Sequence, residues 1–581
     1  MRVFLSSALL LTAPLFAQTF AQNQPDWVKK SDANARLLID IQAKYEPENA
    51  GSNGVRGVDE EISDLTSGPK ERDAIRAARV ELQSRLTRET DPLIKQDLQI
   101  LIDAADQQVR ESEAKEKYFI PWADAGGFVF GGIQGLLDDQ IAPARRAAAL
   151  VRLRKYTGLQ PGFKPLTIVA EERFREKENQ SGLLGPSKEE VEKGLENSKA
   201  YVNGIGLLFE KYKIRDYAPA FAKLKEQLAD YEAFVRKEVI PRERSSFRLP
   251  PEYYEIELKG YGVDYSSAEL ARLAHASFTD IQAQMQVLAT KIAKQRGLPS
   301  SDYRDVIATL KKDQIPANQV LSHYEKRLAE IEDVIRANHL VTLPQRKALI
   351  RIATAAETAQ QPAPHLQPAP LLNNHGERSV FVLPLETTGK GGDAMKYDDF
   401  SYAAASWTLT AHEARPGHEL QFDGMIEHGV SQARGIFAFN STNVEGWGLY
   451  AEWFMLPYMP DDAKLVSLDF RLLRAARAFL DPELQQGKIT PEQAMQVLEK
   501  DVVCSKAFAT EEIERFTFGA PGQAVSYFDG LTRLLEIRQA AEKALGPKFN
   551  AQKFHDFILS QGLLPPDLLR KAVMEDFVHA S

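Results

Sequence analysis

The amino-acid sequence predicts a mainly α-helical protein with one small β element. Apolar residues return at three- and four-residue intervals over long stretches, as in "AIRAARVELQSRL" and "DLQILIDAADQQV", and this is the period of an amphipathic helix. Strand-like alternation is scarce, and its best example is "RSVFVLPLE" at Arg378–Glu386. The chain is therefore expected to bury its core between helices, with a short β element before residue 400.

The helical period marks the expected elements in chain order. We expect helical segments at Pro69–Lys115, Lys188–Tyr212, Tyr217–Val239, Ser267–Gln295, Ala317–Asn338, Met459–Leu480 and Pro491–Glu499. Breaks fall at residues 49–54, 182–187, 247–254 and 360–374, and the last is rich in Pro and should be extended and exposed. The chain divides into a helical N-terminal region, 23–360, and a region at 361–581 that holds the motifs considered below.

Residues 1–22 have the pattern of a secretory signal peptide. Arg2 precedes an apolar run at Val3–Leu11, and small-residue cleavage candidates end at Ala17 or Ala21. The run is shorter than the ~20 residues that a membrane span needs. We therefore expect an exported protein, periplasmic or secreted, with no stable membrane insertion after the signal is removed.

The charge balance argues against one class of partner. The whole chain has 72 Lys and Arg against 81 Asp and Glu, a formal charge of −9, and loss of Arg2 with the signal makes it −10. Nucleic-acid binding needs a basic stripe, and none is apparent, so no nucleic-acid partner is expected. Cys504 is the single cysteine, so no intramolecular disulfide can form.

The stretch "TAHEARPGHELQ" places two histidines six residues apart. His412 and Glu413 begin like the H-E-x-x-H helix of zinc peptidases, but the next histidine is His418. Six residues at 100° turn His418 about 240° from His412 on an ideal helix, too far for two ligands of one ion. Pro416 and Gly417 lie between them, so we expect a bulge or kink that returns His418 towards His412. The alternative is a pair of polar histidines at a helix end.

A second segment, "NSTNVEGWGLYAEWF", offers a third ligand. Glu445 and Glu452 are seven residues apart, so on a helix they lie within about 20° of one another. Glu445 would complete a His2Glu zinc site with one open position, and Glu452 would orient an imidazole. The alternative is that the aromatic residues of this helix form core while both glutamates are solvated.

"HEARPGHELQ" followed by "EGWGLYAE" resembles the signature of the domain of unknown function 885 family, H-E-x-x-P-G-H-x-x-Q and then E-G-W-x-x-Y-x-E. "PGQAVSYFDGLTRLLEIR" and "FHDFILSQGLLPPDLL" are similar to that family's closing segments. The resemblance implies a helical zinc-peptidase-like fold and a single catalytic unit over both regions. It implies one zinc ion at His412, His418 and Glu445, with Glu413 as base, and it adds Gln421 to Glu452 as a supporting residue.

Two positions depart from the family pattern. "RAARAFLDPELQ" places Arg474, Arg477 and Asp481 as expected, but Gln485 stands where a histidine is frequent. Leu383 stands where many members have an asparagine at the end of the strand. The resemblance implies that the metal chemistry survives both changes, whereas substrate preference is open.

Other residues are candidates for catalysis or substrate binding. Glu413 would act as general base. Tyr527 and His555 could donate to an oxyanion or bind substrate, although either could equally be a packed structural residue. Arg515 and Arg538 could bind the C-terminal carboxylate of a peptide, because guanidinium binds carboxylates bidentately, and ordinary salt bridges are the alternative.

The predicted function is an exported zinc metallopeptidase that hydrolyses short peptides, of carboxypeptidase or dipeptidase type. A metal site between amphipathic helices should lie in a deep cleft that folded proteins cannot enter. The alternatives are a zinc amidase acting on cell-wall peptides and a non-catalytic helical protein that binds peptides. Glu413 favours catalysis, because a degenerate site tends to lose its base. The sequence indicates no oligomeric state.

Overall fold

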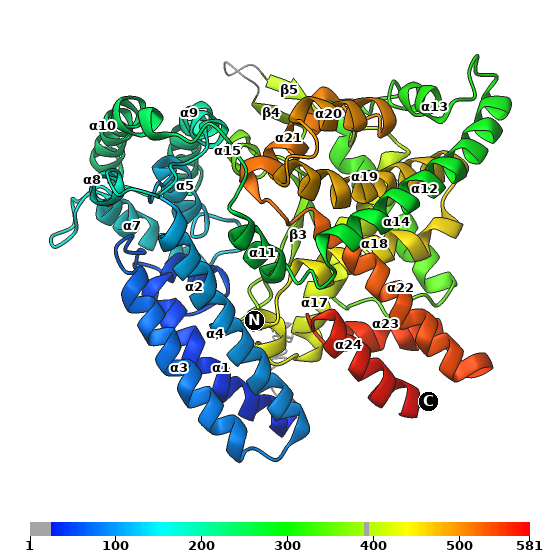
Figure 1. Cartoon of the computed structure of the whole chain (residues 1–581), viewed down its shortest axis with the longest axis horizontal. Coiled ribbons are helices and arrows are strands. Elements are labelled where there is room, and N and C mark those ends of the chain that lie inside the picture. Colours follow the sequence, from blue (N-terminus) through cyan, green and yellow to red (C-terminus); the bar gives the residue numbers. More distant parts are fainter. Residues whose placement is uncertain (1–24, 389–393, 581) are drawn as a thin grey trace, which may run out of the picture.

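The computed structural model describes residues 25–388 and 394–580, so the predicted signal peptide lies outside the described residues. The region up to residue 340 is helical (Figure 1). Its helices are α1 Asp26–Tyr45, α2 Pro47–Ser52, α3 Gly68–Arg88, α4 Pro92–Tyr118, α5 Ala125–Gln134, α6 Pro143–Arg146, α7 Ala148–Tyr156, α8 Leu166–Lys177, α9 Lys188–Lys211, α10 Ala218–Phe234, α11 Pro251–Gly260, α12 Ser267–Arg296, α13 Tyr303–Leu310 and α14 Ala317–Ala337.

The remainder adds five short strands and a second set of helices. The strands are β1 Leu349–Ile352, β2 His365–Gln367, β3 Val380–Leu383, β4 Glu386–Thr388 and β5 Ala394–Lys396. The helices are α15 Ala355–Gln360, α16 Ala405–Glu413, α17 His418–His428, α18 Ser441–Met455, α19 Asp461–Gln485, α20 Pro491–Gln496, α21 Lys506–Glu514, α22 Val525–Leu545, α23 Ala551–Ser560, α24 Pro566–Ala572 and α25 Val578–Ala580. Two π-helical turns used below are η5 Ala433–Phe437 and η8 Arg515–Gly519.

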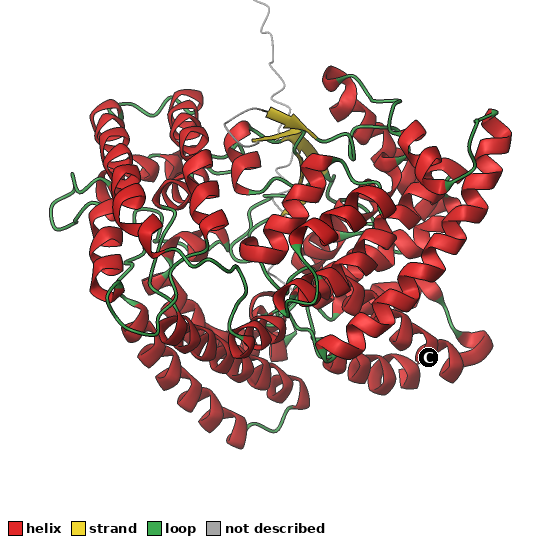
Figure 2. Cartoon of the chain, turned by 45° about the horizontal axis from the view of Figure 1, so that its top comes forward, coloured by secondary structure: helices red, strands yellow, loops and turns green. Residues whose placement is uncertain are grey.

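The helices form three groups. Helices α1, α3 and α4 pack together at one side, and α5 and α7–α10 form a second group beside them (Figure 1). The third group, the C-terminal body, is built around α12 packed along α19 and α18 packed along α22. The strands lie between the helices of the N-terminal groups and those of the C-terminal body (Figure 2). This mainly helical architecture with a small sheet confirms the predicted fold class.

The small sheet has the strand order β1-β3-β2. β1 runs parallel to β3, with Leu349 opposite Val380, and β2 runs antiparallel to it, with His365 opposite Val382. Every residue of β3 is buried. The Pro-rich segment 360–374 was expected to be exposed, but it contributes the edge strand β2 and buries Ala369, because its backbone pairs with β3.

Element boundaries follow local chemistry that the helical period does not capture. The predicted segment Pro69–Lys115 is two helices, because α4 starts anew where Asp91 caps the amides of Leu93 and Ile94. Pro92 supplies the first residue of α4, where a missing N–H costs nothing.

The main core of the C-terminal body draws on both halves of the chain. Buried residues from Tyr254–Leu328 and from Phe381–Phe528 form one hydrophobic cluster. The β1–β3 pairing also crosses residue 360, where the sequence suggested a division, and that division stays a prediction. Over the described ranges, 25–388 and 394–580, no helix combines the length and apolar character of a bilayer span.

Candidate metal centre

The two histidines lie on two helices rather than on one bulged helix. α16 ends at Glu413, and α17 begins at His418, so the segment 414–417 is a break of four residues. Gly417 lies against the end of α16, since a Cβ there would be 1.8 Å from the carbonyl oxygen of His412. Trp447 of α18 donates its indole N–H to the carbonyl of Pro416 at 3.0 Å. The break, rather than the expected bulge, returns His418 towards His412. The centroids of the two imidazole rings are 4.6 Å apart.

His412, His418 and Glu445 converge on one point. The ligand atoms that they offer all lie within 4.8 Å of one another. Oε2 of Glu445 is 3.3 Å from Nε2 of His412 and 3.4 Å from Nε2 of His418. Although burial alone would raise it, the two imidazoles hold the pKa of the Glu445 carboxyl well below its usual range.

The spacing of this triad fits a tetrahedral ion better than direct hydrogen bonds. Zinc binds imidazole nitrogen and carboxylate oxygen at about 2.0–2.2 Å, so neighbouring ligand atoms of a tetrahedral site are about 3.3 Å apart. Hydrogen bonds from nitrogen to oxygen usually measure about 2.9–3.0 Å. Three donors from two imidazoles and one carboxylate leave a fourth position free, as catalytic zinc sites do.

Glu452 holds the imidazole of His412 from the other side. Its Oε1 is 2.7 Å from Nδ1 of His412, and its Oε2 accepts a hydrogen bond from Thr408 at 2.5 Å. Arg474 lies 3.6 Å from the same carboxylate. A carboxylate at Nδ1 places the proton there and directs the lone pair of Nε2 towards the triad centre. Nδ1 of His418 has no hydrogen-bond partner in the described part of the chain.

Helix α18 is confined between the imidazole and α22. Gly448 faces the ring, since a Cβ there would be 2.6 Å from Cε1 of His412. Gly446 is two residues earlier, about 200° round the helix, and its added Cβ would be 2.6 Å from the backbone of Gly530 in α22. The two glycines let α18 touch both neighbours, and this contact places Glu445 at the triad.

Glu413 is buried beside the triad and has an oxygen free. Its side chain is 7% exposed, and Oε2 has no hydrogen-bond partner among the described residues. Burial raises the pKa of Glu413 to about 8, and the neighbouring His418 opposes that rise. A cation at the triad would oppose it in the same way, which would favour the carboxylate that a general base requires.

Tyr527 lies next to His412 within a group of arginines. Its ring is 6.3 Å from the His412 ring between centroids, and the two planes differ by 16°. The guanidinium of Arg477 lies 4.5 Å from the Tyr527 ring centroid, and that of Arg474 lies 5.8 Å from it. Nη1 of Arg515 is 3.5 Å from the tyrosine hydroxyl. The structure therefore brings two of the candidates, Tyr527 and Arg515, to the triad.

The arginine group keeps unused hydrogen-bond donors. Arg477 binds Glu512 bidentately through Nε and Nη2, both at 2.6 Å. Its Nη1 is buried without a partner in the described residues, and so is Nε of Arg474. Arg515 is 16% exposed in its side chain and Glu445 is 15% exposed, whereas His412 is 2% exposed, so this is the side from which a ligand can approach.

Two candidates, His555 and Arg538, lie in a different cluster, around Tyr450, and their catalytic or binding roles stay predictions. His555 has both ring nitrogens engaged, with Nδ1 at 2.7 Å from the carbonyl of Leu340 and Nε2 at 2.9 Å from the hydroxyl of Tyr450. Burial lowers the pKa of His555 to about 4. Arg538 donates to the same Tyr450 hydroxyl at 2.6 Å and pairs with Glu542. Their polar groups stabilise the packing of α18, α22 and α23 and are not directed at the triad.

The remaining sequence candidates have structural contacts. Gln421 donates its amide to Asn443 at 2.9 Å and so joins α17 to α18. Gln485 accepts from the amide of Leu249 and donates to the carbonyl of Phe516, which joins α19 to the loop before α11 and to η8. Leu383 is fully buried at the end of β3. None of the three side chains forms a hydrogen bond or an ion pair with His412, His418 or Glu445 within the described residues.

The model of the family "Bacterial protein of unknown function (DUF885)" matches residues 47–573. No curated protein matches the chain.

Two similar solved structures support the fold. One is a "putative lipoprotein of unknown function" from Shewanella oneidensis, with a TM-score of 0.68 and 18% identity, covering 95% of this chain and 100% of the other. The second is a "putative lipoprotein" from Colwellia psychrerythraea, with a TM-score of 0.72 and 18% identity, covering 95% and 99%. At that identity the likeness concerns the fold alone, whereas the family match spans most of the sequence. The chain belongs to the DUF885 family of bacterial proteins.

Proposed function

We propose that the protein is an exported zinc metallopeptidase that removes residues from the C-terminal end of short peptides. The observation that carries the proposal is the spacing of the Nε2 atoms of His412 and His418 around the carboxylate of Glu445, 3.3 and 3.4 Å, which is the edge of a zinc tetrahedron. The unpartnered carboxylate of Glu413 beside it supplies the base that such a site needs.

Residues at or beside the triad can be assigned to each step of the proposed hydrolysis. A zinc ion held by the triad would polarise a peptide carbonyl and lower the pKa of a coordinated water to about 7. Glu413 would accept a proton at its free Oε2 from the attacking water and deliver it to the leaving amine. The hydroxyl of Tyr527 and Nη1 of Arg515, 3.5 Å apart, would donate hydrogen bonds to the developing oxyanion or to the substrate.

The arginine group supports the exopeptidase type. The buried, unpartnered N–H groups of Arg474 and Arg477 and the partly exposed Arg515 lie next to the triad, and these donors remain unused although Glu452, Glu511 and Glu512 lie beside the guanidinium groups. Guanidinium binds carboxylates strongly, and an unpaired donor in a buried place gains most from such a partner. A free C-terminal carboxylate of a peptide provides that partner within reach of the metal centre.

Export and restriction to short peptides are further parts of the proposal. The apolar run Val3–Leu11 supports export, and both similar structures are called lipoproteins, a class of exported protein. The triad is almost fully buried between α16, α17 and α18, which supports the expectation of a deep cleft that admits short peptides and excludes folded proteins.

The test compares hydrolysis and metal content in the same preparations. Zinc-loaded protein should release alanine from the C-terminus of tetra-alanine and act far more slowly on tetra-alanine amide. Glu413→Gln keeps the shape of the side chain, so zinc should remain while the rate falls by roughly 100-fold or more. A Glu413→Gln variant with full activity, or wild-type protein that cleaves no peptide, would overturn the proposal.

A further inference from the structure

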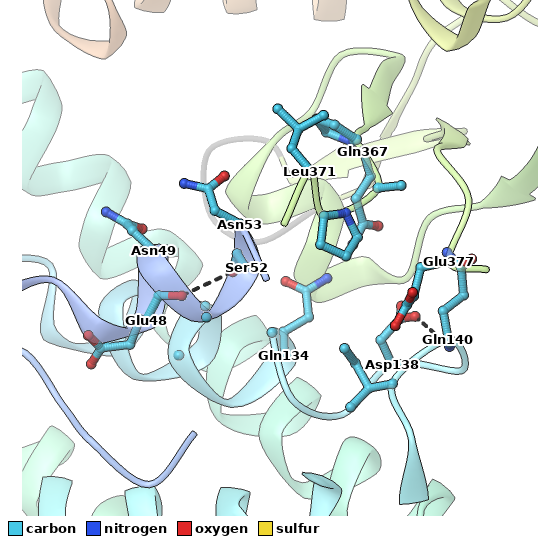
Figure 3. A pocket seen from close by; sticks show the side chains of 18 of the residues that line it. Glu48, Asn49, Ser52, Asn53, Gln134, Asp138, Gln140, Gln367, Leu371 and Glu377 are labelled. Atoms are coloured by element: carbon cyan, nitrogen blue, oxygen red, sulfur yellow. Dashed lines mark hydrogen bonds between the residues drawn. The ribbon is translucent and has the colours of Figure 1, made fainter. Parts of the chain in front are cut away.

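A second cavity of about 770 Å³ lies between the N-terminal helices and the small sheet (Figure 3). Its walls come from α2, α5, β2, η5 and the loops beside them, segments that are far apart in the sequence. A volume of this size lies within the range of sites that bind small molecules and short peptides. None of the triad residues lines it.

One wall of the cavity contains β2, an edge strand of the sheet. All three residues of β2, His365, Leu366 and Gln367, line it. β2 pairs with β3 on one side only, and no described strand pairs with its other edge. A free edge presents backbone N–H and C=O groups to which an extended peptide can add as a further strand.

The opposite walls are rich in amide side chains. Gln134 lies across the cavity from Gln367 and Leu371, and Asn49 and Asn53 lie towards one end (Figure 3). An amide carries both donors and acceptors, so it matches the alternating N–H and C=O groups of a peptide backbone. This lining favours a ligand with many polar groups of both kinds over an apolar one.

The charges of the cavity favour a cationic end on the ligand. Arg145 and Arg351 line the wall, but each guanidinium is already paired bidentately, with Asp59 and with Glu357. Asp138 and Glu377 line the cavity as well, and Gln140 links their segments, because its N–H bonds Asp138 while its side chain bonds the backbone of Arg378 (Figure 3). Each has one oxygen bonded to a nearby backbone amide, and within the described residues neither forms a salt bridge, although Glu377 also interacts electrostatically with Arg145.

The cavity and the metal centre share a helix. Phe422 lines the cavity and follows His418 by four residues on α17, so the two side chains lie one turn apart on the same face. Asp423 of α17 accepts hydrogen bonds from the amide and hydroxyl of Ser379, at 3.1 and 2.7 Å. Ser379 directly precedes β3, the central strand, and its hydroxyl also accepts from the amide of Ala369, two residues after β2, so the sheet is fixed against the helix that carries a triad ligand.

We propose that this cavity binds the N-terminal part of the peptide substrate, extended along β2, with its α-ammonium group at Asp138 and Glu377. The assignment rests on the proposed peptidase function and deepens it, because it makes the preferred substrate a short peptide with a free amine as well as a free carboxylate. Recognition of both ends sets an upper limit on substrate length.

The experiment measures binding and turnover separately. Two proteins are titrated calorimetrically: the Glu413→Gln variant, and the same variant with the additional changes Asp138→Asn and Glu377→Gln. Each protein is titrated with tetra-alanine and with N-acetyl-tetra-alanine. Both changes keep an oxygen for the local amide. Asp333→Asn, at a carboxylate that is 81% exposed on α14, is the matched control. KM and kcat for both peptides are then measured in the background that retains Glu413.

The double change should weaken the binding of tetra-alanine and raise its KM about tenfold, with kcat unchanged. The expected size is that of the loss of two partly exposed charge contacts. Acetylated peptide should bind about tenfold more weakly to the parent and equally to the double variant, and Asp333→Asn should change neither. Hydrolysis by the wild-type protein with no effect of the double change would overturn the cavity assignment and leave the peptidase proposal standing. Cavity-dependent binding without any hydrolysis would overturn the peptidase and leave a peptide-binding site.

Discussion

Replacing Gly448 by alanine adds one methyl group against a proposed zinc ligand. The added Cβ would be 2.6 Å from Cε1 and 2.8 Å from Nε2 of His412, whereas ordinary contacts start near 3.4 Å. The ring or the helix must therefore move by about 0.8 Å, the difference between 3.4 and 2.6 Å. Helix α18 has little room to retreat, because Gly446 on its other face already touches the backbone of Gly530.

The displaced ring should cost metal affinity rather than folding. Ligand distances in a zinc site tolerate changes of about 0.2 Å, so a shift of about 0.8 Å removes His412 from the ligand set. Loss of a supporting residue alone costs 10–100-fold in affinity, and we expect Gly448→Ala to cost about 100-fold or more, ~2.7 kcal/mol. Alanine is also the better helix former by about 1 kcal/mol, so the metal-free protein should lose little stability.

The assay is competition for zinc with a chromophoric chelator, together with thermal unfolding of the metal-free protein. Gly424→Ala is the matched control, since it lies inside α17 and its added Cβ would meet the nearest side chain, at Cδ2 of His428, only at 3.9 Å. The control should keep wild-type zinc affinity. Equal zinc affinity for Gly448→Ala and wild type would refute the assignment of His412 as a ligand held against α18.

Two further predictions concern residues beside the triad, and a third concerns the buried carboxyl of Asp32. Glu452→Gln should weaken zinc binding 10–100-fold in the same competition assay, because the carboxylate that orients Nδ1 of His412 loses its charge. Arg515→Gln should raise KM by about tenfold or more for peptides with a free C-terminal carboxylate and leave C-terminal amides unchanged. Burial raises the pKa of Asp32 to about 6, so the folded protein holds a proton between pH 4 and 6 that the unfolded chain has lost, and stability falls as pH rises through that range. Other buried carboxyls, Glu413 among them, contribute to the same slope, so Asp32→Asn should reduce it by the share of one proton and add about 3 kcal/mol at neutral pH in chemical unfolding, and an unchanged slope would contradict this.

The sequence predicted what depends on local spacing. The helical period located α9, α12 and α14 within a residue or two of their ends, because each has a continuous apolar face that packs on a neighbour. The seven-residue spacing of Glu445 and Glu452 placed both carboxylates at His412. Oε2 of Glu445 contacts Nε2 of the imidazole, and Oε1 of Glu452 contacts Nδ1. Periodicity suffices for pairs on one helix, since the helix itself fixes their separation.

The rest depended on contacts between distant segments. Pro416 and Gly417 indicated a disturbed helix, but the sequence did not distinguish a break from a bulge. The hydrogen bonds from Trp447 to the carbonyls of both residues stabilise the break. His555 and Arg538 looked equivalent to Tyr527 and Arg515 in the sequence, yet they pack around Tyr450.

The arginine group and the polar cavity also depend on contacts between distant segments, which the sequence did not predict. Arg474 and Arg477 were recognised only as part of a family pattern, and their approach to Tyr527 needs α19 to lie against α22. The cavity joins residues from Gln42 to Phe439, and no spacing in the sequence relates them. Such sites are set by tertiary packing, on which one sequence alone carries little information.

The most direct test of the metal centre is a zinc-edge anomalous difference map from crystals of the zinc-loaded protein. We expect one strong peak about 2.0–2.2 Å from Nε2 of His412, Nε2 of His418 and a carboxylate oxygen of Glu445. The peak should disappear in His418→Ala crystals grown with the same zinc. A zinc-loaded crystal with no peak at the triad, or with its ordered zinc bound elsewhere, would contradict the account.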